Sequence, residues 1–178
     1  TLKPAADYKY NVPVVYYGSS ITQGGCASRP GMAYQNIISR ELDCDHINLG
    51  FSGSAKAEEV IAEYIAGLKM SVFVYDYDHN APTLEHLQKT HEPFFKIIRQ
   101  AHPDLPIVMM TKPVYKLSQS DPCLKTIKKT YENALAAGDK NVYFIDGSKI
   151  YEGWEDATVE GCHANDLGFF LQAGAVEN

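Results

Sequence analysis

Residues 14–25 read Val14-Val15-Tyr16-Tyr17-Gly18-Ser19-Ser20-Ile21-Thr22-Gln23-Gly24-Gly25. Four β-favouring residues lead directly into small polar residues and two glycines, which is typical of a buried strand whose carboxyl end opens into a tight loop. Ligands of open α/β sheets bind outside the carboxyl ends of the strands, so hydroxyl groups at this point face a candidate site. One of these serines is therefore either a nucleophile or a turn residue.

Short apolar runs without alternation recur along the chain, and helical periodicity follows each of them. Strands are expected at residues 12–17, 46–50, 71–75, 106–110 and 141–145, and helices at 33–42, 55–68, 83–98, 121–137 and from 165 onward. Repeated βα units predict a parallel sheet covered by helices on both faces. Thr83 is expected to cap the helix at 83–98, which Pro93 is expected to kink or split, and Asp121-Pro122 is expected to start the following helix. Residues 1–178 are expected to form one domain, with a leading segment at 1–11.

The charge balance and the cysteines exclude several classes of partner. The chain has 16 Lys and Arg residues against 22 Asp and Glu residues, a net charge of −6. Since basic patches are lacking, neither a nucleic acid nor a membrane is expected as a partner. No apolar run approaches the ~20 residues of a membrane-spanning helix. The four cysteines lack C-x-x-C spacing and are expected to be free thiols, and neither a metal nor an organic cofactor is implied.

Small and polar residues also follow the second and third strands. They are Gly50, Ser52 and Gly53 after the second strand, and Asp78, His79 and Asn80 after the third. In a doubly wound sheet these strand ends lie side by side with the first. A nucleophilic serine needs a base within hydrogen-bond reach and donors aimed at the developing oxyanion. Glycine lets a backbone N–H approach that oxygen closely, and an Asn amide supplies another donor.

The segment Glu160-Gly161-Cys162-His163 offers the base. A carboxylate three residues before a histidine can fold back onto the imidazole Nδ1, which fixes the tautomer and leaves Nε2 free for a serine. Cys162 is a disfavoured alternative nucleophile, because adjacent loop residues usually point apart. The histidines at 46, 86, 91 and 102 are expected on helix or strand surfaces and carry no functional signal.

Four segments together resemble the sequence blocks of the SGNH (GDSL-type) hydrolase family. They are Gly18-Ser19-Ser20-Ile21-Thr22, Asn48-Leu49-Gly50-Phe51-Ser52-Gly53, Asp78-His79-Asn80 and Glu160-Gly161-Cys162-His163. Their order and spacing extend over nearly the whole chain. The resemblance implies an α/β protein with a flavodoxin-like three-layer α/β/α fold around a central five-stranded parallel sheet. It also implies a serine esterase, closest to bacterial carbohydrate acetylesterase-like members.

The resemblance assigns roles by position. The nucleophile falls on Ser20 rather than on Ser19, the base on His163 and the orienting acid on Glu160. Glu160 stands where the family usually has Asp, and its side chain is one methylene longer. Asp156, seven residues before the histidine, is therefore the alternative acid.

The remaining assignments concern the oxyanion and the substrate. The oxyanion donors fall on the backbone N–H groups of Ser20 and Gly53 and on the Asn80 side chain, which could instead cap the following helix. Possible substrate contacts are Ser19, Arg29, Asp78 and His79. A solvated charge is the alternative for Arg29, and a structural hydrogen bond is the alternative for His79.

The loop at 18–31 is similar to that of bacterial family members that deacetylate sugars, some of which carry a β-sandwich domain before this one. A start at Thr1 is compatible with such a missing domain. We therefore expect hydrolysis of short acyl esters on an oligosaccharide or small molecule. The expected compartment is the bacterial cytoplasm, or an exported location if a signal was removed.

Three rival functions stay open. The first is a lipase or other acyl-ester hydrolase of the same family, and the second is a non-catalytic carbohydrate-binding module whose triad is impaired at Glu160. The third follows from Asp76-x-Asp78, which matches haloacid-dehalogenase-type phosphatases but lies on the third expected strand rather than on the first.

Overall fold

The computed structural model describes residues 3, 5–115 and 118–177, so two residues of the loop expected between the fourth strand and the following helix lie outside them. Within this part of the chain, one sheet has the strand order β2-β1-β3-β4-β5, and every pairing is parallel. The strands are β1 (Tyr10–Gly18), β2 (Cys44–Gly50), β3 (Val72–Asp76), β4 (Ile107–Met110) and β5 (Val142–Ile145). The predicted flavodoxin-like α/β/α fold is confirmed. The strand order reverses beside β1, and sheets of this kind bind ligands at such a reversal.

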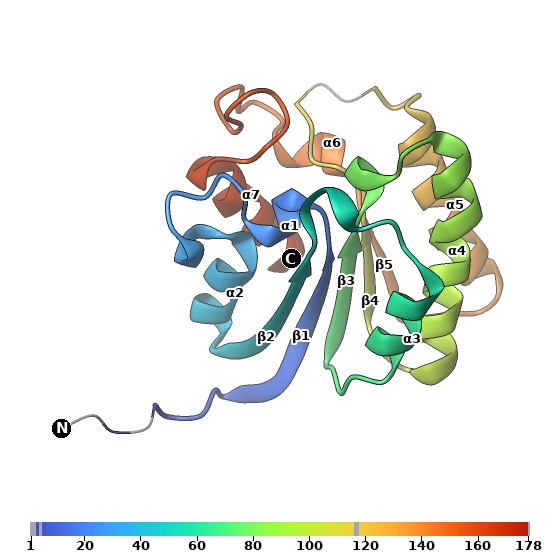
Figure 1. Ribbon diagram of the computed structural model, residues 1–178, viewed down its shortest axis with the longest axis horizontal. Coiled ribbons are helices and arrows are strands. Elements are labelled where there is room, and N and C mark those ends of the chain that lie inside the picture. The colour runs from blue at the N-terminus through green and yellow to red at the C-terminus, as the bar shows by residue number, and fades with distance from the viewer. Residues whose placement is uncertain (1–2, 4, 116–117, 178) are drawn as a thin grey trace.

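Helices cover both faces of the sheet (Figure 1). One face carries α3 (Glu59–Ala66), α4 (Leu84–Ala101) and α5 (Pro122–Ala136), and the other carries α2 (Tyr34–Leu42) and α7 (Asp166–Glu177). Tyr17 packs into the hydrophobic core beneath α3, α4 and α5, and its neighbour Tyr16 packs into the core beneath α2 and α7. Both rings are buried. Because both sides of each strand are covered, the strands lack apolar–polar alternation. Among the described helices, none is long and apolar enough to cross a membrane.

The helix boundaries follow local capping signals. The Thr83 hydroxyl accepts a hydrogen bond from the N–H of His86 at 3.1 Å, and the Asp121 carboxylate accepts one from the N–H of Cys123 at 2.8 Å. The predicted Thr83 cap and the predicted helix start at Asp121-Pro122 are therefore confirmed, and the structure adds that the Asp121 side chain caps α5. The helix expected at 55–68 starts only at residue 59, because Ala57 has a φ of 55° and lies outside the helical region.

Helix α4 differs from the expectations at two residues. Pro93 does not split the helix, which runs unbroken from residue 84 to 101. Pro93 is exposed, so the carbonyl that loses its helical donor lies on the solvent side of the helix. His91 is 1% exposed rather than on the surface. Its Nδ1 lies 2.9 Å from the Thr130 hydroxyl, its ring stacks on Tyr75, and burial lowers its pKa to about 3.

The sequence pattern does not predict the short helices α1 (Ser20–Gln23) and α6 (Gly147–Ile150). Helix α1 lies very close to the ends of β1 and β2. A Cβ atom on Gly18 would lie 2.2 Å from the Thr22 hydroxyl, and one on Gly50 would lie 2.2 Å from the Gln23 nitrogen. Glycine at both strand ends therefore lets the helix that begins with Ser20 sit directly on the sheet.

We expect Gly50→Ala to lower the free energy of unfolding by about 2–3 kcal/mol or more, because its Cβ would overlap the backbone of α1. Urea unfolding followed by circular dichroism measures this loss. Gly174→Ala in α7 is the matched control, since its Cβ would meet no heavy atom within 4 Å. Equal stability of the two variants would contradict the close packing of α1.

Candidate active site

Ser20 is the first residue of α1 and directly follows the turn out of β1. Its neighbour Ser19 is fully buried, and the Ser19 hydroxyl accepts a hydrogen bond from the N–H of Ile21 at 3.2 Å. Ser19 therefore caps α1, and the expected substrate contact by this residue is wrong because no surface of it is accessible. The backbone N–H of Ser20, at the first position of the helix, has no intrahelical acceptor.

A chain of hydrogen bonds joins Ser20 to two residues near the C-terminus. The Ser20 Oγ lies 2.8 Å from the Nε2 of His163. The His163 Nδ1 lies 2.5 Å from the Glu160 Oε1, which also accepts the backbone N–H of His163 at 2.9 Å. The structure thus brings together three predicted residues that are separated by as many as 143 positions.

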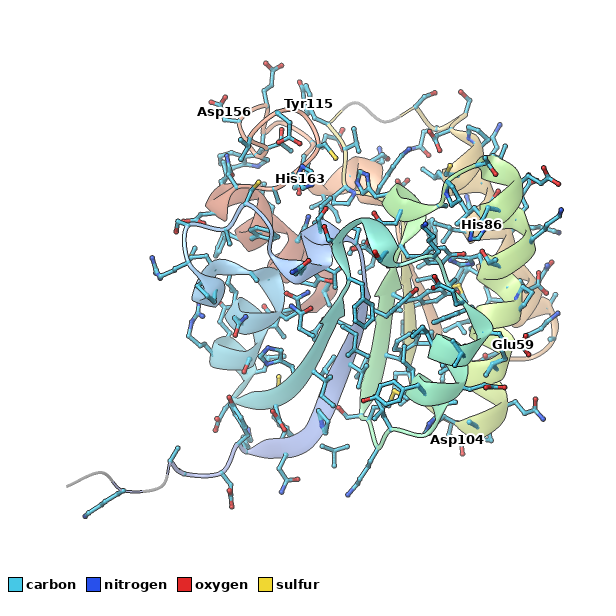
Figure 2. The ribbon with its side chains drawn as sticks, viewed as in Figure 1. Glu59, His86, Asp104, Tyr115, Asp156 and His163 are labelled. Carbon is cyan, nitrogen blue, oxygen red and sulfur yellow. The ribbon has the colours of Figure 1, made fainter. Side chains whose placement is uncertain are left out.

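Glu160, rather than Asp156, reaches the histidine. The Asp156 side chain is exposed, and its backbone carbonyl accepts a hydrogen bond from the Asn165 amide. Figure 2 shows Asp156 at the outer edge of the molecule, beyond His163. Hydrogen bonds from the backbone N–H and then the ring of His163 hold the pKa of Glu160 below its usual value, so this carboxylate is ionised at neutral pH.

The two predicted oxyanion loops lie against each other. Gly53 is in the turn Ser52–Ser54 after β2, and Asn80 ends the turn Asp78–Asn80 after β3. The Asn80 side-chain amide donates a hydrogen bond to the Ser52 carbonyl. An amide nitrogen carries two hydrogens, so one donor of Asn80 stays available. Gly53 is exposed, and no heavy atom lies within 4 Å of the position of a Cβ on it.

The two aspartates of the D-x-D pattern are buried. Asp76 is 1% exposed and its Oδ2 accepts a hydrogen bond from the Thr22 hydroxyl at 3.3 Å. Asp78 is 5% exposed and its Oδ2 accepts the backbone N–H of Lys112 at 3.1 Å. Burial raises the pKa of Asp78 to about 6. Neither carboxyl can meet a phosphate, and the expected substrate contact by Asp78 is wrong because this side chain faces the protein interior.

His79 and Arg29 occupy the surroundings of the site. The His79 Nδ1 lies 3.7 Å from the Cys162 sulfur, which favours the structural alternative for this residue. Burial, followed by the positive charge of Lys112, lowers the pKa of His79 to about 4, so the ring is neutral at neutral pH. Hydrogen bonds from Ser28, and then the charge of Arg29, lower the pKa of Asp166. Arg29 itself is exposed, which favours the solvated charge over a substrate contact.

Two contacts near the site carry no sequence signal. The Ser28 N–H and hydroxyl donate to the Asp166 carboxylate at 2.8 and 2.5 Å, which ties the glycine-rich loop to the start of α7. The Tyr115 hydroxyl donates to Glu155 at 2.6 Å. Both pairs join residues at least 40 positions apart, and no spacing rule relates such residues. Only the folded chain brings them together.

A parallel α/β sheet with a hydrogen-bonded serine, histidine and carboxylate beside its switch point defines an ester-hydrolase class of protein. Comparison with known families agrees, because the model of the GDSL-like lipase/acylhydrolase family matches residues 11–178. The chain belongs to this family. A search among curated proteins found no significant match.

Solved structures with this fold include several esterases. A GDSL-like lipase from Bacteroides ovatus is 33% identical over 97% of this chain and 52% of its own, with a TM-score of 0.85. The salicylyl-acyltransferase SsfX3 from a tetracycline biosynthetic pathway is 20% identical over 98% and 54%, with a TM-score of 0.80. A family two carbohydrate esterase from Clostridium thermocellum, in complex with cellohexaose, is 16% identical over 98% and 64%, with a TM-score of 0.73. This chain spans about half the length of the first two.

Asp76 makes a testable contribution to stability. Burial, and then the neighbouring Asp78 charge, raises the pKa of Asp76 well above its usual value. The folded protein therefore keeps a proton that the unfolded chain releases above about pH 4. Folding stability falls as pH rises through this window, by up to about 1.4 kcal/mol per pH unit. Asp76→Asn removes this contribution.

Urea unfolding between pH 6.5 and 8 isolates the effect, because Asp78 has largely titrated below that range. We expect the stability of Asp76→Asn to fall less steeply with pH than that of the unmodified protein. Asp104→Asn at an exposed position is the control and should keep the original slope. Parallel profiles for all three proteins would show that Asp76 is already ionised in the fold.

Proposed function

We propose that this chain is a serine esterase that hydrolyses short acyl esters, mainly acetyl esters on carbohydrate, through an acyl-enzyme. The observation that carries the proposal is the hydrogen-bond chain from Ser20 through His163 to Glu160. A Ser–His–carboxylate set of this kind activates the hydroxyl for attack on a carbonyl carbon. The same geometry argues against a non-catalytic module, because the longer Glu160 side chain does reach the imidazole.

In the acylation step, the Ser20 Oγ attacks the ester carbonyl while His163 Nε2 removes its proton. Glu160 accepts the Nδ1 hydrogen, which keeps Nε2 unprotonated before the attack and stabilises the imidazolium afterwards. The imidazolium then returns its proton to the leaving alcohol. The acyl group stays on Ser20.

The oxyanion of the tetrahedral intermediate is held by three donors: the N–H groups of Ser20 and Gly53 and the free hydrogen of the Asn80 amide. The Asn80–Ser52 hydrogen bond supports this role, because it fixes the amide beside the backbone of the Gly53 turn. In deacylation, His163 removes a proton from water, and the resulting attack releases the acid and restores Ser20.

The exposure of the site supports an ester on a carbohydrate. Gly53 and Glu160 are both exposed, so a bulky alcohol group can stay outside the protein while its acyl group is attacked. Trp154, which is 50% exposed, lies on the segment that leads to His163. An exposed indole offers a flat apolar surface with a polar N–H, which suits the face of a sugar ring. Among the similar structures are carbohydrate esterases, including a two-domain esterase active on acetylated mannans.

We expect Ser20→Ala and His163→Ala to lower kcat on p-nitrophenyl acetate by about 10⁴-fold or more, because each removes a member of one relay. Glu160→Gln should lower kcat by up to about 10⁴-fold, because the imidazole loses its orienting acceptor. Asp156→Asn is the matched control and should retain activity. Full activity in Ser20→Ala or in His163→Ala would disprove the mechanism, as would loss in Asp156→Asn with retention in Glu160→Gln.

The acyl group and the alcohol can be tested separately. We expect the rate to fall along a series of aryl esters from C2 to C12, and we expect acetate release from acetylated oligosaccharides. Trp154→Ala should raise KM for the acetylated oligosaccharide and leave the hydrolysis of p-nitrophenyl acetate unchanged, because the small ester has no sugar ring to stack. A preference for long acyl chains would instead support the lipase alternative.

A further inference from the structure

The hydrolytic mechanism leaves the cysteine of the glycine-rich loop unused. Within residues 3, 5–115 and 118–177, one group of His, Cys, Asp and Glu side chains lies close enough together to hold a metal ion, namely Cys26, Glu160 and His163. One ligand atom from each residue lies within 4.8 Å of the other two. A third functional group, a thiol, thus stands beside the two residues that activate Ser20.

The position of Cys26 is set by hydrogen bonds on both sides of it. The N–H of Gly25 donates to the Ser20 carbonyl at 2.8 Å, and Ser28 donates twice to Asp166. These bonds hold the loop between the nucleophile and the start of α7. Since His163 lies just before α7, the thiol faces the imidazole although the two residues are 137 positions apart in the sequence. The cluster is therefore built by two anchored segments.

The chemistry of the three groups matches zinc. Zn²⁺ takes Cys sulfur, His nitrogen and carboxylate oxygen in a tetrahedral arrangement, with the ligand atoms roughly 3.3–3.6 Å apart. The three ligand atoms here lie within 4.8 Å of one another, so the side chains must rotate to reach that spacing. The side chains of His163 and Glu160 are 36% and 48% exposed, so an ion in solution can reach them.

We propose that Cys26, Glu160 and His163 form a site for Zn²⁺ that inhibits the enzyme. On binding, Cys26 loses its proton to solvent, the three residues ligate the ion, and water takes the fourth position. Zinc on His163 Nε2 would take the lone pair that accepts the Ser20 proton. Zinc on Nδ1 would replace the hydrogen bond to Glu160. Either arrangement removes the base, so the inhibition rests on the proposed function, whereas zinc binding itself does not.

Isothermal titration of the whole chain with ZnCl₂ tests the binding. We expect one Zn²⁺ to bind per chain, and the affinity to fall by roughly tenfold or more in Cys26→Ser and in His163→Ala. Cys162→Ser is the matched control, because this thiol neighbours His163 but lies outside the cluster. Co²⁺ provides an independent readout, since a thiolate-to-cobalt absorption band should form in the unmodified protein and in Cys162→Ser and should be absent in Cys26→Ser.

Inhibition is measured on p-nitrophenyl acetate, with each variant referred to its own metal-free rate. Zinc should inhibit the unmodified protein and Cys162→Ser, EDTA should restore the rate, and Cys26→Ser should require roughly tenfold more zinc. Equal affinity in Cys26→Ser and the unmodified protein would overturn the site, and binding without inhibition, or activation by zinc, would overturn its inhibitory role. If no esterase activity exists, the proposed function fails, while titration and the cobalt band still decide the site.

Discussion

The close contact between α1 and the ends of β1 and β2 is the constraint on which the site depends. Gly18 pairs with Gly50 on one side and with Asp76 on the other, so one backbone position joins the ends of three strands. The space that a side chain would fill at the two glycines is taken up by α1. Ser20 begins that helix, so the packing of α1 on the strand ends also decides where the hydroxyl of the proposed nucleophile lies.

The rest of the site is attached to this point by hydrogen bonds between distant segments. The Glu160 carboxylate hydrogen-bonds both the backbone N–H and the ring of His163. The backbone N–H of Ser28 donates to Asp166, three residues after that histidine. Exposed polar contacts of this kind add little stability singly. Their effect here is on geometry, because together they limit the directions in which the imidazole can turn toward Ser20. Such preorganisation is what lowers the cost of proton transfer.

Much of the fold, and much of the proposed catalytic relay, follow from local patterns. Strand runs that end in small residues identified the Ser19-Ser20 turn, the resemblance to a known family selected Ser20 within it, and the three-residue spacing to His163 favoured Glu160 over Asp156. The failures share a different cause. The burial of Ser19 and His91 depends on what packs over them, and the approach of Cys26 to His163 depends on loops joined through Asp166. Local sequence does not encode contacts between distant segments.

Protein cores rarely contain carboxyl groups, yet the end of β3 and the turn after it bury two of them. Asp76 and Asp78 each have one buried oxygen that finds no hydrogen-bond partner among the described residues, which costs stability. The other oxygen of each carboxyl accepts a hydrogen bond that links two elements of the fold. Asp76 accepts from Thr22 in the helix of Ser20, and Asp78 accepts from Lys112 after β4. The carboxyls thus link neighbouring strand ends beside the proposed site, and functional sites are where proteins tolerate such departures from the ordinary rules of packing.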